Sequence, residues 1–338
     1  MDSFYLSGRG RLSERLAADL GAARDRARAT STPQEFVAGE ETFLVAARPL
    51  NKYPFRLDHE NGIIGLTSSK SLPTVNVQPS AAFIHAAGIQ MALYWFIGTI
   101  EMLLGEVEWT ASRVDVFVDV QGWGLASDDR DRFVCRARDL AMWESSAQFQ
   151  TLRFGTGKSG LMARIYDKTE ESRIKGTDWW PEVWGDAYVP GERVLRVEYQ
   201  VGRSALNQTS IHEPIEGLHR LPRLWAYLTD EWLSYRKRTG DGTKSRWPVA
   251  PEWESVQQAS LRNGALGLER VRSGQRAGSM RRLLPGARGY LASVGAVGGA
   301  ESLGDALRLL GREIALQDEG GKHSFDAQLA SKRLAYGL

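Results

Sequence analysis

Apolar residues recur along the chain at two different spacings, and the change between them separates helical from extended regions. Near the N-terminus they lie three or four apart among charged residues. This first stripe consists of Leu12, Leu16, Leu20, Ala23 and Ala27. The spacing predicts an amphipathic helix over residues 11–30.

A second helix is predicted over residues 80–104, which are largely apolar. Its most apolar part, residues 89–104, is about 16 residues long and includes Gln90 and Glu101, so it is too short and too polar to span a membrane. We therefore expect a buried helix within a folded domain.

Other segments alternate apolar with polar residues between Gly or Pro, which is typical of strands. They are residues 74–78, 113–120, 150–154, 161–168 and 194–201. Helices are predicted at residues 128–145, 303–314 and 324–334, and the Gly- and Ala-rich segment 286–300 is interpreted as a hinge or a loosely packed connection. This order predicts an α+β fold with a central antiparallel sheet and helical N- and C-terminal regions.

Composition narrows the class of protein. The chain has 338 residues, 42% hydrophobic and 25% charged, which is the balance of a globular protein and excludes wholesale disorder. The single cysteine, Cys135, excludes an internal disulfide framework and a cysteine-based zinc cluster. It favours a reducing, cytoplasmic location. The first residues lack the pattern of a secretory signal, and we expect no membrane association.

Charge is unevenly distributed, although the net charge is only +2. Twelve Lys or Arg residues stand against four Asp or Glu residues between Ser234 and Tyr290. Such a segment is typical of contact with a polyanion, while a solvated arginine-rich surface would have the same composition. The candidate phosphate contacts here include Arg236, Lys237, Arg238, Lys244, Arg246, Arg270 and Arg272.

Three of the predicted strands each place their polar residues on one face, because successive residues of a strand point to opposite sides. These residues are Arg113, Asp115 and Asp119 with Phe117 in the first strand, Arg164, Tyr166 and Lys168 in the second, and Arg196, Glu198 and Gln200 in the third. If the strands are neighbours, one sheet face carries an active site and helices pack on the other. The alternative is an ordinary half-exposed face with cross-strand ion pairs.

This set of side chains suggests chemistry on phosphate. Carboxylates from adjacent strands could bind Mg²⁺ or Mn²⁺. A tyrosine beside such an ion could attack a phosphodiester, while the ion and the arginines offset charge in the transition state.

Three segments, in the same order and at similar spacing, resemble motifs of the trans-acting initiators that start rolling-circle replication of plasmids of the staphylococcal type. The segment FGTGKSGLMARIYDK at residues 154–168 is similar to the signature FGxxxSxxxxRIY[ND]K. SRVDVFVD at residues 112–119 and LRVEY at residues 195–199 are similar to the strands TR[LI]DhhhD and WR[VI]EhEL, where h is hydrophobic. The resemblance spans about residues 70–250, and Gln200 departs from it by replacing an acid.

The resemblance implies that Tyr166 nicks one DNA strand at a replication origin. The tyrosine becomes joined to the 5′ phosphate and leaves a free 3′-OH. It further implies that Asp115 and Glu198 bind the metal, with Asp119 as a third candidate ligand. A homodimer and a host helicase partner are also implied.

The remaining candidate residues would act on phosphate. Arg164, Lys168 and Arg196 would position or neutralise it beside the tyrosine. Lys158 and Ser159 lie in a glycine-rich turn that could contact DNA. This turn is not a nucleotide-binding P-loop, since Leu152 occupies the place of its first glycine and a strand follows.

We therefore expect an N-terminal helical segment (residues 1–45), a catalytic nicking domain (46–235) and a basic helical C-terminal region for DNA recognition and possible dimerisation (236–338). A conjugative relaxase that nicks a transfer origin by the same chemistry is an alternative. So is an origin-binding protein or repressor that has lost the nicking activity.

Overall fold

A computed structural model describes residues 1–145, 148–157, 160–259, 268–270, 280–317, 325–326 and 329. Contacts divide the chain into two compact units, one of residues 1–176 and 192–271 and the other of residues 177–191 and 272–338. The functional division predicted at residues 45 and 235 stays a prediction.

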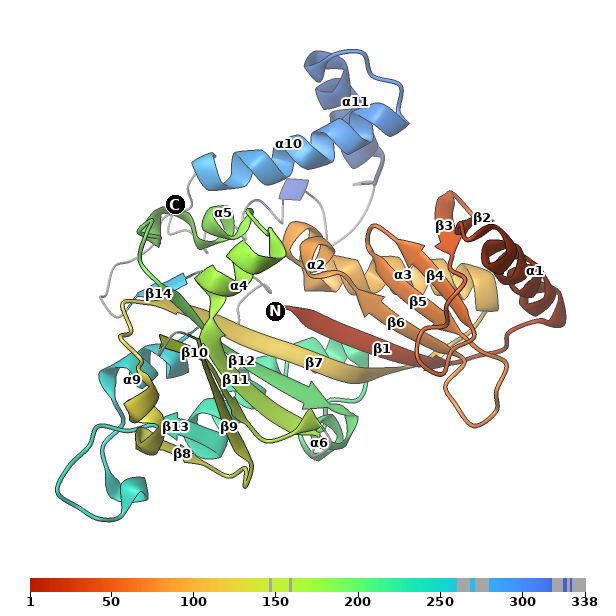
Figure 1. The fold of residues 1–338 in the computed structure, drawn as a ribbon. Helices are drawn as coiled ribbons and strands as arrows, with labels where there is room; N and C mark the ends of the chain where they lie inside the picture. Colours follow the sequence, from red (N-terminus) through yellow and green to blue (C-terminus); the bar gives the residue numbers. More distant parts are fainter. Residues whose placement is uncertain are drawn as a thin grey trace. The chain divides into compact units, whose positions relative to one another are not determined.

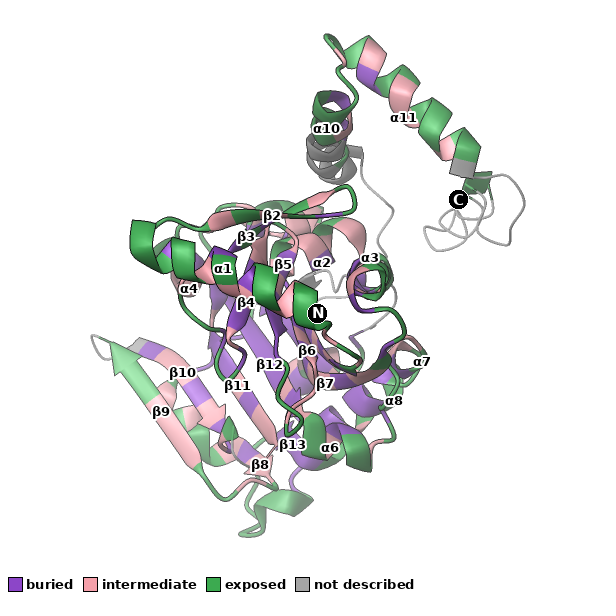
Figure 2. Ribbon diagram, turned by 90° about the vertical axis from the view of Figure 1, so that its right-hand side faces the viewer, coloured by how far each residue is buried: buried purple, intermediate pink, exposed green. Residues whose placement is uncertain are grey.

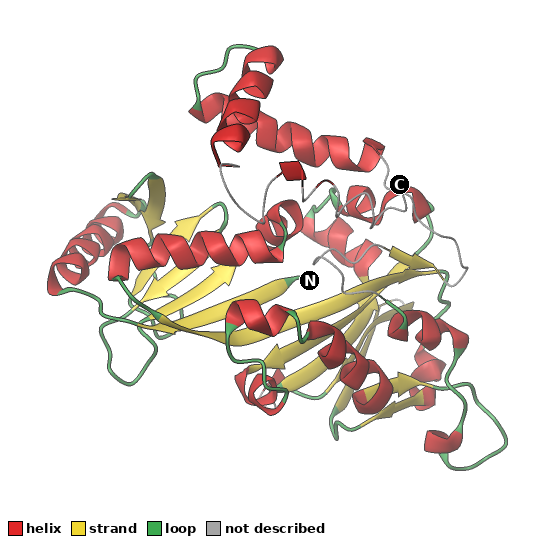
Figure 3. Ribbon diagram, turned by 180° about the vertical axis from the view of Figure 1, so that it is seen from behind, coloured by secondary structure: helices red, strands yellow, loops and turns green. Residues whose placement is uncertain are grey.

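The first unit is built on one large sheet (Figure 1). In spatial order its antiparallel strands are β2 (Gln34–Ala38), β3 (Glu41–Val45), β4 (Phe55–His59), β5 (Gly62–Leu66), β6 (Val75–Pro79), β1 (Ser3–Arg9), β7 (Glu108–Gln121), β12 (Val194–Gly202), β11 (Leu161–Asp167), β10 (Gln148–Phe154) and β9 (Leu140–Ser145). The short β14 (Leu268–Arg270) pairs in parallel with β7. The predicted α+β class with a central antiparallel sheet is confirmed, as the strands and helices of Figure 3 show.

The predicted N-terminal helix is α1 (Glu14–Thr30), which packs on β2, β3 and β4. The Ser13 hydroxyl caps its first turn by accepting a hydrogen bond from the Leu16 N–H at 3.2 Å. Leu20, Ala23 and Ala27 of the predicted apolar stripe are its buried residues. Figure 2 shows the outer side of this helix exposed, while buried residues run along the central strands of the sheet.

The apolar helix predicted over residues 80–104 is two helices, α2 (Ala81–Ala87) and α3 (Ile89–Leu104), bent by 113°. The bend lies at Gly88, whose φ of 83° belongs to the left-handed region that glycine tolerates best. Among the described helices, none is long and apolar enough by itself to cross a membrane, and only this bent pair reaches the necessary length and hydropathy together.

Helices lie on both sides of the central strands (Figure 1). α2 and α4 (Lys168–Lys175) lie on one side. On the other are α6 (Arg203–Gln208), α7 (Pro214–Leu218), α8 (Leu221–Ala226), the π-helical turn η4 (Tyr227–Trp232), α9 (Pro251–Gln257), and the strand pair β8 (Phe133–Cys135) and β13 (Leu233–Tyr235). We call this second side the reverse face. Its core includes Tyr199 of β12, whose ring makes edge contacts with Trp225 and Trp232.

The helix predicted at residues 128–145 is wrong. The chain forms a 3-10 turn η1 (Ser127–Arg132), then β8 and β9. Pairing of β9 with β10 and of β8 with β13 supplies tertiary contacts that override the helical pattern of residues 128–145. The alternation of apolar and polar residues does not predict β1 to β5, which precede the first expected strand.

The second unit contains α5 (Trp180–Trp184), the turn η3 (Gly185–Ala187), α10 (Met280–Val297) and α11 (Leu303–Gln317). α11 confirms the helix predicted at residues 303–314. The hinge predicted over residues 286–300 is wrong, because α10 covers most of it. A Cβ atom at Gly295 would lie 3.0 Å from that of Ala306, so small residues allow α10 and α11 to pack closely. The helix predicted at residues 324–334 lies almost entirely outside the described residues.

Candidate active site on three neighbouring strands

The three strands with polar faces are consecutive in the sheet, in the order β7, β12, β11. One row across them aligns Asp119, Arg196 and Tyr166, and the next aligns Phe117, Glu198 and Arg164. This register confirms that the predicted residues of β7, β12 and β11 share one face. The prediction is wrong for Lys168, which begins α4 instead of continuing the strand. We call it the polar face.

Tyr166 and Glu198 form the central contact of this face. The Tyr166 hydroxyl donates a hydrogen bond to Glu198 Oε2 at 2.9 Å. Arg164 donates to the other oxygen of the same carboxylate. Tyr166 is 8% exposed and Glu198 is 2% exposed. The pKa of Tyr166 is raised well above its usual value, mainly by burial and to a smaller extent by the negative charge of Glu198. The phenol therefore keeps its proton at neutral pH.

Asp115 is the second buried carboxylate of the polar face. Arg113 Nε donates to its Oδ1 at 2.8 Å. Burial raises the pKa of Asp115 to about 6 despite this arginine, and the negative charges of Glu198 and Asp2 contribute to the increase. Asp115 and Glu198 therefore repel each other across the sheet, and a cation between them would relieve that repulsion.

The donor set fits a hard divalent ion. Mg²⁺ commonly binds one or two carboxylates and completes its shell with water and substrate phosphate oxygens. Asp115 and Glu198 offer such a pair, and their partners Arg113 and Arg164 have side chains 31% and 39% exposed, so both arginines have room to move. Within the described residues no three His, Cys, Asp or Glu side chains form a group able to hold a metal ion.

Asp119 is engaged differently from the other two acids. Arg196 Nε and Nη2 donate to its two carboxylate oxygens at 2.7 and 2.8 Å. Both residues are fully buried, and the Arg196 guanidinium lies 3.6 Å from the centre of the Phe117 ring. Both Asp119 oxygens are thus already bonded, and Arg196 has no exposed surface. This geometry favours a role in positioning Tyr166, the cross-strand neighbour of Arg196.

Lys168 begins α4 immediately after the strand that carries Tyr166. Asp167 caps this helix by accepting a hydrogen bond from the Glu170 N–H at 2.9 Å. Lys168 Nζ lies 6.0 Å from the centre of the Tyr166 ring and donates to Glu171 Oε2 at 2.6 Å. Burial, then the charge of Arg196, lower the pKa of Lys168. Its ammonium group is therefore close to the tyrosine but bonded to a carboxylate.

Two residues near the site were not among the candidates. Asp2 Oδ1 lies 3.5 Å from Arg196 Nη1 and 4.0 Å from His85 Nε2. The His85 ring, carried by α2, lies 5.9 Å from that of Phe117. Burial, the largest cause, lowers the pKa of His85 to about 3, so the ring is neutral at physiological pH. Neither residue lies in a motif, and no local pattern links them to β12.

The described basic residues between β13 and α9 are not brought to the polar face. Lys237, Arg238, Lys244 and Arg246 are exposed in a loop near β8 and β13, on the side of the sheet away from α4 (Figure 1). Arg236 is half-buried, and its Nε donates to Ser234 Oγ at 2.9 Å. Lys158, Ser159, Arg272 and the side chain of Arg270 lie outside the described part of the chain.

Comparisons with known proteins give limited matches. No family model matches the chain. Over 132 residues the chain is 31% identical to a protein of Pseudomonas phage Pf1 described as uncharacterized protein ORF430. The match covers 32% of this chain and 30% of the phage protein, so the chain spans less than a third of that relative.

A solved structure, that of a rolling circle replication initiator protein from Geobacillus stearothermophilus, is similar to this chain. The similarity has a TM-score of 0.48 at 15% identity and covers 78% of this chain and 97% of that one. An identity and a TM-score this low do not assign the chain to a family. The function is therefore inferred from the side chains of the polar face.

Proposed function

We propose that the protein nicks and rejoins one DNA strand at an origin, with Tyr166 as the nucleophile, and so initiates rolling-circle replication. The observation that carries this proposal is the hydrogen bond from Tyr166 to Glu198, inside a segment that resembles the R-I-Y motif of such initiators. The hydroxyl has a carboxylate in place to accept its proton and arginines near the position of a phosphate.

In the proposed reaction the Tyr166 oxygen attacks phosphorus, and its proton passes to Glu198. A bond forms between the tyrosine oxygen and phosphorus while the bond from phosphorus to the 3′ oxygen breaks. The 3′ oxygen leaves and takes a proton from solvent, which gives a 3′-OH. The strand remains joined to Tyr166 through its 5′ phosphate. Rejoining is the reverse reaction, with a 3′-OH as nucleophile.

Charge accumulates on the phosphate oxygens as the bonds exchange. Arg164 is half-exposed beside Tyr166 and can turn from Glu198 to the phosphate. A Mg²⁺ or Mn²⁺ ion held by Asp115 and Glu198 would supply further positive charge and relieve their repulsion. Asp119 is the third candidate ligand and would have to release Arg196 to serve as one.

Origin DNA is the proposed partner, with the exposed Lys237, Arg238, Lys244 and Arg246 as phosphate contacts that set affinity rather than sequence. We also propose that residues 236–338 recognise the origin DNA, that a host helicase is a partner and that the protein forms a homodimer. These proposals rest on the sequence resemblance.

The experiment is a search for a covalent adduct. The protein is incubated with single-stranded and supercoiled origin DNA and Mg²⁺ or Mn²⁺, and a denaturing gel and peptide mass spectrometry locate any attached nucleotide. We expect the adduct on Tyr166 and its loss in Tyr166→Phe, with DNA binding retained. Tyr199→Phe is the matched control, because Tyr199 is buried on the reverse face. An adduct on another tyrosine would exclude the assigned nucleophile.

The same assay separates the alternatives. A relaxase would form the Tyr166 adduct with a transfer origin and not with a replication origin. An origin-binding protein or repressor without nicking activity would bind DNA but form no covalent adduct with either metal ion. The second outcome would overturn the proposed activity.

A further inference from the structure

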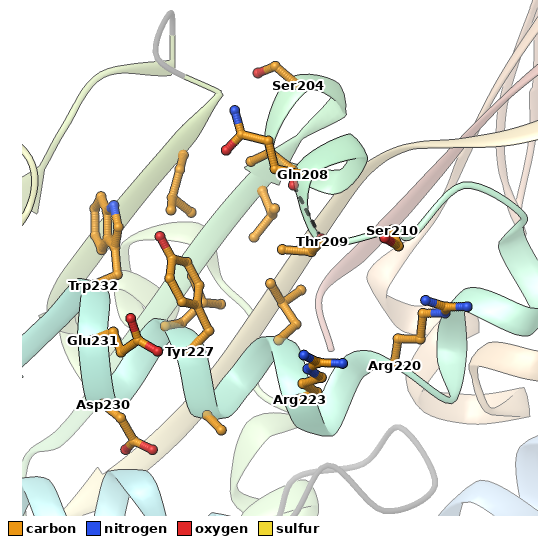
Figure 4. Close-up of a pocket in the computed structure, with 16 residues that line it drawn as sticks. Ser204, Gln208, Thr209, Ser210, Arg220, Arg223, Tyr227, Asp230, Glu231 and Trp232 are labelled. Atoms are coloured by element: carbon orange, nitrogen blue, oxygen red, sulfur yellow. Dashed lines mark hydrogen bonds between the residues drawn. The ribbon is translucent and has the colours of Figure 1, made fainter.

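A cavity of 670 Å³ opens on the reverse face of the sheet, where β11 begins and β12 ends. Figure 4 shows its walls, which come from α6 with the turn after it, from α8 and from η4. Leu161, Val201, Leu224 and Trp232 are among its apolar lining residues. Since the Tyr166 hydroxyl belongs to the polar face, the proposed nicking reaction does not use this cavity. Its volume falls within the range of small-molecule sites.

One wall carries an aromatic ring that a ligand can reach. Tyr227 is half-buried, and Figure 4 shows its ring beside the cavity. The Arg136 guanidinium lies 5.8 Å from the ring centre, which helps to fix the ring. Tyr227 begins η4, a π-helical turn of a kind that is rare in proteins and frequent at functional sites. A planar group could stack on this ring.

Positive charge lies on the same helical wall and just before it in the chain. Arg220 and Arg223 both line the cavity and are exposed. Arg220 Nη2 forms an ion pair with Glu216 at 3.1 Å. The Arg223 side chain has no hydrogen-bond or ion-pair partner within the described part of the chain. Ser210, beside Arg220 in Figure 4, adds a hydroxyl group and has a left-handed φ of 57°. Guanidinium and hydroxyl groups together are typical phosphate ligands.

Beyond Tyr227 the cavity ends in two exposed acids, Asp230 and Glu231. Asp230 Oδ1 accepts a hydrogen bond from Gln257 at 2.8 Å, and Glu231 Oε2 pairs with Arg136 at 3.0 Å. Each carboxylate has a second oxygen to offer. Carboxylates of this kind accept hydrogen bonds from the exocyclic amino groups of bases.

The cavity is thus lined by arginines, then an aromatic ring, then two carboxylates. From this order we infer that it binds one nucleotide whose base carries an amino group. Arg220 and Arg223 bind the phosphate, Tyr227 stacks on the base, and Asp230 or Glu231 accepts from the amino group. The nucleotide can be free or part of a single strand, since both present the same phosphate and base. The inference does not depend on the proposed nicking activity.

The experiment measures binding in EDTA, so that no metal-dependent reaction contributes. Fluorescence anisotropy with labelled (dC)₃ and (dT)₃ tests the strand, and saturation-transfer NMR with dCMP tests the free nucleotide. We expect (dC)₃ to bind more tightly than (dT)₃, because thymine lacks the amino group. Arg223→Gln and Tyr227→Leu should each weaken (dC)₃ binding about tenfold. Tyr227→Phe should bind as the unmodified protein does.

Arg15→Gln is the matched control, because it removes one exposed arginine from α1 and should leave binding unchanged. Thermal unfolding of each variant verifies its folding. Equal affinity for dCMP and (dC)₃ would identify a free nucleotide as the ligand, and tighter binding of (dC)₃ would identify a strand. Undiminished (dC)₃ binding in both Arg223→Gln and Tyr227→Leu would overturn the inference and leave the cavity to another ligand, such as a peptide.

Discussion

The two faces of β7 and β12 are made by alternate residues of the same strands, and both are buried, yet they are stabilised in opposite ways. On the polar face, Asp119 and Arg196 are each fully buried and joined by two hydrogen bonds. On the reverse face, Val116 and Tyr199 are equally buried among apolar and aromatic side chains. The charged groups are therefore buried as an ion pair, and this pairing fixes the side chains around Tyr166.

The two tyrosines show the same contrast. Burial raises the pKa of both Tyr166 and Tyr199 well above the usual value. The Tyr166 hydroxyl donates to Glu198, whereas the Tyr199 hydroxyl has no hydrogen-bond partner within the described residues. Burial alone thus does not prepare a nucleophile. The carboxylate that can accept its proton distinguishes the candidate site.

The largest expected effect is on activity. Glu198→Gln keeps the shape of the side chain but removes the proton acceptor, so we expect the rate of adduct formation to fall about 100- to 10,000-fold. Rate measurements on a labelled oligonucleotide test this expectation. Glu171→Gln, which alters the partner of Lys168 instead, is the control. A rate within a factor of a few of the unmodified protein would exclude Glu198 as the base, and recovery in excess Mn²⁺ would assign the loss to metal binding.

The next effect is on stability. Asp119→Ala leaves the buried Arg196 guanidinium without its main partner, and we expect the free energy of unfolding to fall by about 3–5 kcal/mol. Urea denaturation measures it. Glu216→Ala breaks the exposed ion pair with Arg220 and should cost less than about 1 kcal/mol. Equal losses in the two variants would contradict the view that the polar face depends on buried pairing.

A smaller effect of opposite sign is expected on the reverse face. Tyr199→Phe removes a buried hydroxyl that has no partner within the described residues, so the free energy of unfolding should rise by up to about 1 kcal/mol. The same urea titration measures this change. A loss of more than about 1 kcal/mol would show that the hydroxyl is bonded in solution.

The smallest effect concerns Cys135 of β8. Burial raises the pKa of this thiol to about 11, despite a hydrogen bond from the Ala137 N–H. The thiol is thus protonated at pH 8, and its labelling by a disulfide reagent should be slow there. The labelling rate should increase about tenfold per pH unit towards pH 11. A rate that is already maximal at pH 8 would show an ordinary or lowered pKa.

The alternation of apolar and polar residues was sufficient to predict the polar face. Successive residues of β7, β11 and β12 point to opposite sides of the sheet, so the sequence determines which of them lie on the same face. It could not predict the partners on that face, since Asp119 and Arg196 are 77 residues apart in the chain. Asp2, which directly precedes β1, and His85 of α2 also reach the site, and nothing local to either residue indicates this.

The missed strands have a similar explanation. β5 reads Gly-Ile-Ile-Gly-Leu, which does not alternate, and its extended form depends on pairing with β4 and β6. The predicted helix over residues 128–145 fails for the same reason, since β9 is defined by its partner β10 rather than by its own residues. Local pattern thus predicts a strand well where one of its faces is polar and the other apolar, as in β7 and β12.

The position of β1 has a consequence for the folding rate. β1 comes before every other described strand in the chain, yet it lies between β6 and β7 and joins the two halves of the sheet. Its residues Leu6 and Phe4 pair with Val77 and Val114, so the chain must close long loops before these contacts form. Closing such loops costs entropy before any contact is gained, which slows folding. We therefore expect the halves to become ordered independently and the insertion of β1 to limit the rate at which the sheet is completed.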